Sequence, residues 1–354
     1  MRMFLLFILS AAFALSLPNA DTFSEKMEVQ NAQNMFQRAF SFYCSNETGE
    51  MIDAYNELID KFEYSTNKEI RLITAQAMSN LALAYESVNN TKAEQAVLER
   101  LISKFLNSND SAIELMAAKS LLRKGFIAAN ANDTKGEIET GERFVAIFEN
   151  TDNEDIQAAL AGVMTLLGYN YTRNGEYRKA IDIHNKFIDK FENSHHEYMQ
   201  NQLFINIMWL GLNYVDLGEI KSGLTVYQKM IDKFKNSTNP DIIKGLGTVV
   251  ANKIELEICN DIKPSFSDEN RKIAGKSEYG AFMYEFLQIL YDARNESQSS
   301  KLKTFKEKYA NIDFKKLIGS FDFSDLDRWQ NGLKSPAKER VKECVDILKW
   351  FMEK

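Results

Sequence analysis

The chain has 354 residues, of which 45% are apolar and 26% are charged, and 43 basic against 50 acidic side chains leave a net charge of −7. This composition is ordinary for a folded soluble protein, but the length exceeds what one hydrophobic core usually supports. No block of five or more Lys and Arg residues offers a surface for a phosphate backbone, so we expect no nucleic-acid partner.

The N-terminal residues have the three parts of a secretory signal peptide. A single basic residue, Arg2, precedes an apolar run from Met3 to Leu17, and small and polar residues follow. A membrane anchor is the alternative, but a run of about 15 apolar residues is shorter than the ~20 that cross a bilayer as a helix. We therefore expect residues 1–20 to be a signal peptide, cleaved after Ser16 or Ala20, with no transmembrane segment after its removal. The protein would then be exported to a bacterial periplasm or, alternatively, to the outside of the cell.

An internal repeat runs through most of the chain. The segments Leu58–Phe62, Phe187–Phe191 and Met230–Phe234 read LIDKF, FIDKF and MIDKF. Aligning their last residues gives five Phe residues spaced 43 residues apart: Phe62, Phe105, Phe148, Phe191 and Phe234. Before Phe191, apolar side chains recur in steps of three and four residues, which is the period of one helix face. Each of these segments is therefore expected to end a helix.

Two further columns of the repeat indicate where helices start and stop. One column holds short hydroxyl side chains, which can accept hydrogen bonds from free N–H groups in the turn and at the start of the next helix. Its members are Ser65, Ser108, Thr151, Ser194 and Ser237. We expect the following long helix at about Asn67–Ser87 in one repeat and His196–Leu217 in another. The second column holds Asn and Gly, which tolerate the left-handed conformation in which helices commonly end. Its members are Asn46, Asn89, Asn132, Gly175 and Gly218.

Seven glycosylation sequons occur in the sequence. They begin at Asn46, Asn89, Asn109, Asn132, Asn170, Asn236 and Asn295. Three of them coincide with the helix stops, and their Thr48, Thr91 and Thr134 stand where the next helix needs an N-cap. We interpret these three as turn chemistry rather than as glycosylation sites.

The repeat resembles the tetratricopeptide repeat. Its closest unit reads LGYNY at Leu167–Tyr171 and NGEYRKAI at Asn174–Ile181. Small residues that let two helices approach closely occupy one column: Ala39, Ala82, Gly125, Gly168 and Gly211. Three positions later stand mostly aromatic side chains that fill the gap beyond: Phe42, Tyr85, Ala128, Tyr171 and Tyr214. The period of 43 exceeds the family's 34, and the family's Trp is missing.

The resemblance implies an all-α fold for residues 21–262. It would be a right-handed α-α superhelix of about five to six helical hairpins, with helices of about 20 and about 15 residues. HEAT-like hairpins are the structural alternative. The pattern ends near Ile262, and residues 263–354 are expected to form a helical region that caps the array, or else an independent binding domain.

Three helices are predicted in this C-terminal region. Tyr279–Arg294 is apolar and aromatic, Lys301–Ala310 is basic and amphipathic, and Ser335 with Pro336 would begin the last helix. An apolar stripe follows one face of that last helix: Val341, Cys344, Val345, Leu348, Phe351 and Met352.

The three cysteines are too few for a disulfide scaffold. Cys44 and Cys259 share a column five repeats apart, so they should lie too far from each other to pair. Cys344 could reach Cys259 if the C-terminal region folds onto the last repeat, but buried free thiols are the favoured interpretation.

No catalytic constellation is apparent in the sequence. His184 falls on a helix face and is expected to pack against the neighbouring helix, while His195 and His196 lack the spacing that would bring two imidazoles onto one metal ion. The carboxylates Asp322, Asp325 and Asp327 fit the start of a helix, where Ser324 and Asp327 could form a capping box. No phosphate loop, nucleophile elbow or Cys-x-x-Cys motif occurs, so we expect no enzyme activity, cofactor, metal or small-molecule substrate.

What remains is a binding surface. In tetratricopeptide proteins the first helix of each hairpin lines a concave face, and the resemblance places two columns there. They are Phe36, Phe40, Ser79, Leu83, Leu122, Phe126, Thr165, Tyr169, Met208 and Leu212. These side chains could equally be buried against the next repeat. We expect an exported scaffold or adaptor that binds a protein or peptide in cell-envelope assembly or organisation. The alternatives are an enzyme or ligand-binding site within the C-terminal region, and a purely structural spacer.

Overall fold

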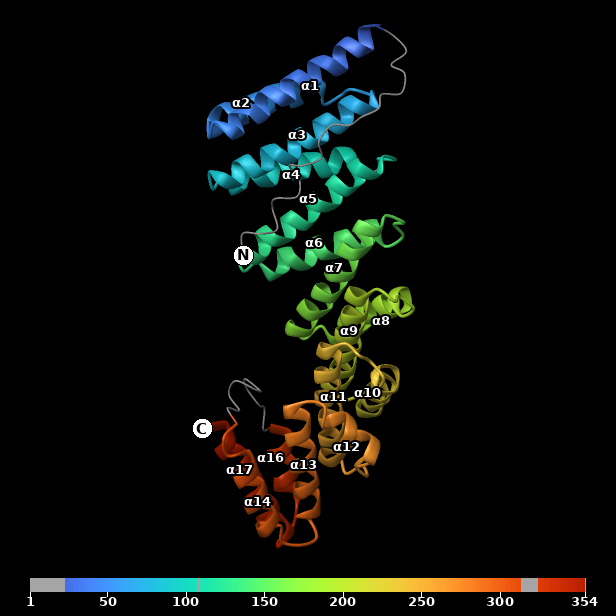
Figure 1. The fold of residues 1–354 in the computed structure, drawn as a ribbon, viewed down its shortest axis with the longest axis vertical. Coiled ribbons are helices and arrows are strands. Elements are labelled where there is room, and N and C mark those ends of the chain that lie inside the picture. Colours follow the sequence, from blue (N-terminus) through green and yellow to red (C-terminus); the bar gives the residue numbers. More distant parts are fainter. Residues whose placement is uncertain (1–22, 107, 313–323, 354) are drawn as a thin grey trace. The chain divides into compact units, whose positions relative to one another are not determined.

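The computed structural model describes residues 23–106, 108–312 and 324–353, and every regular element in these ranges is an α-helix (Figure 1). The predicted signal peptide at residues 1–20 lies outside the described residues. The chain forms two compact units, one ending at Ile156 and the other beginning at Gln157.

The first unit is a stack of three helical hairpins. Its helices are α1 (Phe23–Cys44), α2 (Thr48–Phe62), α3 (Lys68–Ser87), α4 (Thr91–Phe105), α5 (Ser111–Asn130) and α6 (Thr134–Phe148). Each helix packs against the next, and α3 also packs against α1 and α5. The first helices of successive hairpins are therefore neighbours in space, as they are in a helical solenoid.

The same hairpins continue in the second unit, with α7 (Glu154–Arg173) beginning at the border. They comprise α8 (Tyr177–Phe191), α9 (Glu197–Asp216), α10 (Ile220–Phe234) and α11 (Pro240–Cys259). Helices of 20 and 15 residues alternate from α2 to α11, and each begins 43 residues after its counterpart. The expected all-α array of long-helix, tetratricopeptide-like hairpins is confirmed.

The helix-stop column has the predicted backbone conformation. Positive φ angles of 54° to 78° occur at all five of its members, and also at Asp261, which continues the column by one repeat. The N–H of the residue after each stop bonds back into the long helix, as from Glu47 to the Phe42 carbonyl at 2.9 Å. This bond satisfies a carbonyl that the helix end leaves unpaired.

Each residue of the hydroxyl column lies two positions before the N-cap of a long helix. The N-caps of the long helices are Asn67, Asp110, His196 and Asn239, whose side chains accept hydrogen bonds from the first turn. Asn153 does the same for Asp155 and Ile156. The hydroxyl instead accepts the N–H of the cap residue, as Ser65 does from Asn67 at 3.2 Å. The expected Thr caps of the short helices were also displaced, because Thr48, Thr91 and Thr134 are the first helical residues.

Close helix contacts explain the small-residue column. A Cβ added to Gly168 would collide with the His184 ring, and one added to Gly211 would collide with Tyr227. The five Phe residues that define the repeat are all buried, with exposures of 0 to 7%. His184 therefore packs between the helices of its hairpin, as predicted.

The C-terminal helices form an aromatic cluster. They are α12 (Asp268–Ala274), α13 (Glu278–Asp292), α14 (Ser299–Tyr309), α16 (Ser324–Gly332) and α17 (Ala337–Glu353). Phe282 packs with Phe286, Phe305 and Phe351. The described side chains of the predicted α17 stripe are buried, although the helix begins at Ala337, one residue after Pro336.

Helix α11 is covered by α12, α13 and α16, and a buried ion pair fixes the link that leaves it. Lys253 Nζ lies 2.7 Å from Glu257 Oε1 and donates to Ser265 Oγ at 2.7 Å. The backbone N–H of Ser265 donates to the other Glu257 oxygen at 2.7 Å. Because both charged side chains are buried, these bonds hold the segment that leads to α12.

The cysteines are free thiols, so the Cys259–Cys344 disulfide that the sequence allowed is not formed. Cys344 is fully buried in α17 and donates to the Arg340 carbonyl at 3.5 Å. Burial raises the pKa of the Cys344 thiol to about 12 and also raises that of Cys259. Both groups therefore stay protonated, which disfavours thiol exchange.

Candidate functional site

The ten predicted surface residues lie on the first helices of the hairpins, and none belongs to the core. Nine of them are half-buried, and Phe126 is 63% exposed. Phe36 also packs against the buried core of the first unit. Six of them lie in the first unit, and Thr165, Tyr169, Met208 and Leu212 lie in the second.

In the first unit, aromatic side chains of α1 pack against one another and against α2. Phe36 packs edge-on against Tyr55 at 5.7 Å between ring centroids, and Phe40 stacks on Tyr43 at 5.9 Å. Tyr43 is 53% exposed and was not predicted. Its position next to the Phe42 column could have suggested it.

The charged neighbours of Phe126 are engaged in ion pairs. Arg123 Nε lies 2.6 Å from Glu94 Oε1, and its Nη2 lies 2.8 Å from Glu86. Lys124 pairs with Glu99. Phe126 is therefore an exposed apolar side chain beside charges that have already paired.

In the second unit, six residues form what we call the α7–α9 face. Thr165, Leu166, Tyr169 and Arg173 come from α7, and Gln202 and Trp209 come from α9. The Tyr169 and Trp209 rings meet edge-on at 5.4 Å, and the Arg173 guanidinium lies 5.6 Å from the Tyr169 ring. Leu166 is 51% exposed.

Four residues of the α7–α9 face were not predicted from the sequence. Leu166 and Trp209 share a repeat column one position beyond Thr165 and Met208, so a wider search along the same helices could have found them. Gln202 and Arg173 gave no such signal, because polar residues at these positions look like ordinary solvent-facing side chains.

A buried chain of hydrogen bonds lies beneath this face. His184 Nδ1 is 2.7 Å from Asn206 Oδ1, and Asn206 Nδ2 donates to Thr165 Oγ1 at 2.7 Å. Thr165 Oγ1 lies 2.9 Å from both Gln202 Oε1 and the Ala161 carbonyl, and its single proton can be donated to only one of them. Neither His184 nor Asn206 is exposed to solvent, and no group in the described part of the chain bonds to the buried His184 Nε2.

Burial sets the protonation state of His184. The loss of solvation lowers its pKa to about 4, although the bond to Asn206 acts in the opposite direction. The imidazole is therefore neutral near pH 7 and carries its proton on Nδ1, where Asn206 accepts it.

The remaining polar candidates have structural roles. His196 caps α9 by accepting the Tyr198 N–H at 3.2 Å. Asp325 and Asp327 lie in the first turn of α16, and Asp327 pairs with Lys349 at 2.8 Å. Asp322 lies outside the described residues, among which no cluster of potential metal ligands occurs. The sequon residue Asn170 is buried, which rules out its glycosylation in the folded state.

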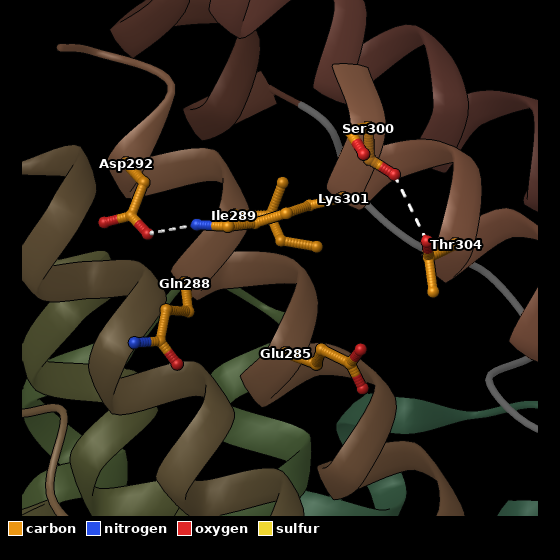
Figure 2. A pocket seen from close by; sticks show the side chains of 7 residues that line it. All are labelled: Glu285, Gln288, Ile289, Asp292, Ser300, Lys301 and Thr304. Carbon is orange, nitrogen blue, oxygen red and sulfur yellow. Dashed lines mark hydrogen bonds and ion pairs between the residues drawn. The ribbon is translucent and has the colours of Figure 1, made fainter. Parts of the chain in front are cut away.

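A surface hollow of about 410 Å³ lies between α13 and α14 (Figure 2). Figure 2 shows Lys301 directed at the Asp292 carboxylate, 3.5 Å away. Glu285 pairs with Lys308 at 2.5 Å, and Gln288 accepts a hydrogen bond from Arg271 at 3.2 Å. These polar groups bond to protein neighbours, so the hollow offers no focused set of groups to a ligand.

No protein-family model matches the sequence, and no curated protein matches it. Among solved structures, the chain is similar to the apo form of RapI, with 14% identity, a TM-score of 0.39, and coverage of 90% of this chain and 99% of that one. A tetratricopeptide repeat protein from Parabacteroides merdae shows 10% identity, a TM-score of 0.36 and the same coverage. The assignment of a tetratricopeptide-like repeat rests on the hairpins of this chain.

No helix in the described ranges has both the length and the apolar character needed to cross a membrane.

Proposed function

We propose that the protein is a non-enzymatic, exported scaffold or adaptor whose first helices bind a protein or peptide partner in cell-envelope assembly or organisation. One observation supports this proposal. Among the described side chains, the large apolar ones that are exposed within helices all lie on first helices: Met27, Tyr43, Phe126, Leu166 and Tyr198. Tyr64 and Val88 are also exposed but lie in turns.

This distribution favours a binding role for the first helices. Burying a large apolar side chain contributes about 1.5–3 kcal/mol, while association costs roughly 4–15 kcal/mol. A few such contacts correspond to reversible binding of about micromolar affinity, which suits an adaptor.

Site-specific photocrosslinking in the cell tests this function. A photoreactive amino acid at Phe126 or Leu166 is expected to capture the same partner. The matched controls are Glu139 on α6 and Gln228 on α10, which are exposed on second helices. Equal capture from the control positions would contradict a role for the first helices. The double variant Phe126→Ala, Tyr169→Ala should lose the partner while keeping its helical circular dichroism.

Export is a separate part of the proposal, and it is supported by the N-terminal leader. N-terminal sequencing of the protein from its native cell should give Leu17 or Asp21 as the first residue. A mature protein that still begins at Met1 would contradict cleavage.

A further inference from the structure

Six exposed lysines form a regular array on the second unit. Two repeat columns, four residues apart, hold lysine in three successive repeats, and we call these residues the lysine ladder. They lie in the last two turns of α8 and α10, in α12 and in the turn after it: Lys186, Lys190, Lys229, Lys233, Lys272 and Lys276. Side chains four residues apart share one face of a helix. The repeat therefore assembles a basic surface that no run of consecutive lysines marks in the sequence.

Contacts between the ends of the short helices bring the lysine ladder onto one surface. Lys233 Nζ donates to the carbonyl of Glu192, which follows α8, at 3.1 Å. Lys276 Nζ donates in the same way to the carbonyl of Lys235, which follows α10, at 3.3 Å. Lys235 also pairs with Glu269 of α12 at 3.0 Å. The ends of α8, α10 and α12 are therefore neighbours, and each ammonium group that bonds to a carbonyl keeps two further N–H donors.

The same columns are occupied differently in the first unit. Arg143 stands in the first of the two columns there, and it pairs with Glu99 at 2.9 Å. Lys229 and Lys272 hold the equivalent positions in the second unit, and neither forms an ion pair with another described residue. Their charges are therefore available to an anion from outside the molecule.

The net charge of the two units follows the same division. The first unit has 14 basic and 23 acidic side chains, a net charge of −9, whereas the second has 29 and 27, a net charge of +2. Within the three ladder segments, residues 186–190, 229–233 and 272–276, the six lysines are accompanied only by Asp189 and Asp232, which leaves a net charge of +4. The lysine ladder is therefore a cationic surface on a chain that is acidic as a whole.

The surroundings of the lysine ladder lack what a protein partner needs. Stable protein interfaces are centred on large apolar and aromatic side chains, and charged residues mostly form the rim. Helices α8, α10 and α12 expose no large apolar side chain, in contrast to the first helices. An exposed ion pair strengthens binding by at most about fivefold, because both long side chains must be ordered to form it.

An anionic lipid surface fits the lysine ladder better. Such a surface presents a continuous negative potential, so each lysine near it strengthens binding about fivefold without a matched carboxylate. A net charge of four then corresponds to a partition constant on the order of 10³ M⁻¹. Binding of this strength is reversible and needs no apolar contact.

We propose that the lysine ladder docks the second unit on a membrane surface that carries anionic phospholipids. The ammonium groups bind lipid phosphates in the headgroup layer, and no helix enters the bilayer. The net charge of −9 disfavours approach of the first unit to the same surface. This inference goes beyond the proposed function, because it uses the second helices and requires no protein partner.

Co-sedimentation of the full mature chain with phospholipid vesicles tests the proposal. We expect binding to vesicles of phosphatidylcholine and phosphatidylglycerol at about millimolar lipid, and no binding to vesicles of phosphatidylcholine alone. Raising the salt concentration should abolish the binding, because exposed charges are screened. Absence of binding to the anionic vesicles at low salt would overturn the inference but leave the proposed function standing, since that function depends on the first helices.

Two double variants with the same change of charge identify the surface. Lys229→Gln, Lys272→Gln breaks no ion pair of the described residues and should weaken binding to the anionic vesicles about 25-fold. The control Lys92→Gln, Lys119→Gln removes two exposed lysines of the first unit, which also form no ion pair with described residues, and should leave binding unchanged. Both variants should keep the helical circular dichroism of the wild type. Equal weakening by the two variants would assign binding to the net charge of the chain and overturn the role of the lysine ladder.

Sedimentation velocity without vesicles separates lipid docking from self-association. The acidic first unit of a second copy is the alternative anionic surface, and its contact with the lysine ladder would produce oligomers at low salt. We expect the wild type and Lys229→Gln, Lys272→Gln to sediment alike. A wild-type oligomer that dissociates in the double variant would overturn the inference and show that the lysine ladder binds another copy of the chain.

Discussion

At the scale of single residues, His184 links the stability of the second unit to pH. Its pKa of about 4 in the folded state lies below the usual 6.5, because burial disfavours the charged ring. The unfolded state therefore binds more protons between these values, and stability falls as the pH drops from 6.5 to 4. The full effect is about 3 kcal/mol, measured as the free energy of unfolding in urea at a series of pH values.

The control for this prediction is His184→Leu, which places the Leu98 residue type at the equivalent position. Its overall stability can differ from that of the wild type, but the slope of stability against pH between 6.5 and 4 should be smaller. An identical slope in the two proteins would assign the pH dependence to other groups.

A substitution at Gly211 tests the close contact between two helices of one hairpin. A Cβ at this position would collide with the buried ring of Tyr227, so Gly211→Ala should destabilise the protein by about 1–3 kcal/mol. Adding Tyr227→Leu should restore part of the loss, because Ala82 and Leu98 form the equivalent pair in another hairpin. The measurement is again urea denaturation.

Gly49 provides the matched control for that substitution. It lies in α2 with open space around its missing Cβ, so Gly49→Ala should stabilise the protein by about 0.5–1 kcal/mol. Destabilisation by both Gly substitutions would contradict the steric explanation.

At the scale of elements, the sequence predicted the helices closely. The 43-residue spacing aligns several hairpins, so the same start and stop residues recur at equivalent positions. The ends of α3 and α9 fall within one residue of their expected positions, and the left-handed turns were found from Asn and Gly alone. The N-caps of the short helices were misplaced by one residue, because Thr48, Thr91 and Thr134 each begin the helix itself. The hydroxyl of Ser65 accepts the Asn67 N–H in the turn, as expected. The short helix α12 was not predicted, since seven residues carry too little periodicity.

The link between α11 and α12 depends on the buried ion pair of Lys253 and Glu257, which no sequence pattern indicated. Lys253→Met should destabilise the second unit by about 3–5 kcal/mol, because it leaves the buried Glu257 carboxylate without its cation. The double variant Lys253→Met, Glu257→Leu should recover much of this loss in denaturation experiments. If both variants are equally unstable, the attachment of Ser265 to Glu257 contributes more than the ion pair itself.

The candidate site was only partly accessible to sequence reasoning. The column positions located Thr165 and Tyr169, because a repeat fixes which helix face each residue occupies. The contribution of Gln202 and Arg173 depends on contacts across helices or within one turn, at 2.9 Å to Thr165 and 5.6 Å to the Tyr169 ring. A one-dimensional pattern does not contain such contacts.

At the scale of the whole molecule, α11 is the last long helix of the repeat and also contacts the C-terminal helices. An array of hairpins leaves the last helix without a neighbour on one side, and such a face requires a polar surface or a cover. Helix α11 has the opposite composition, since Val249, Val250 and Ile254 are almost completely buried. Helix α11 contacts the C-terminal helices α12, α13 and α16 as well as α9 and α10.

Removal of residues 263–354 therefore distinguishes a cap from a separate domain. If the C-terminal helices act as a cap, the shortened chain should expose the apolar side of α11, and hydrogen exchange should accelerate in α9, α10 and α11. Exchange in α1 to α5 should stay unchanged, because these helices belong to the other compact unit. If α11 keeps its protection after the deletion, the C-terminal region folds and acts as an independent domain.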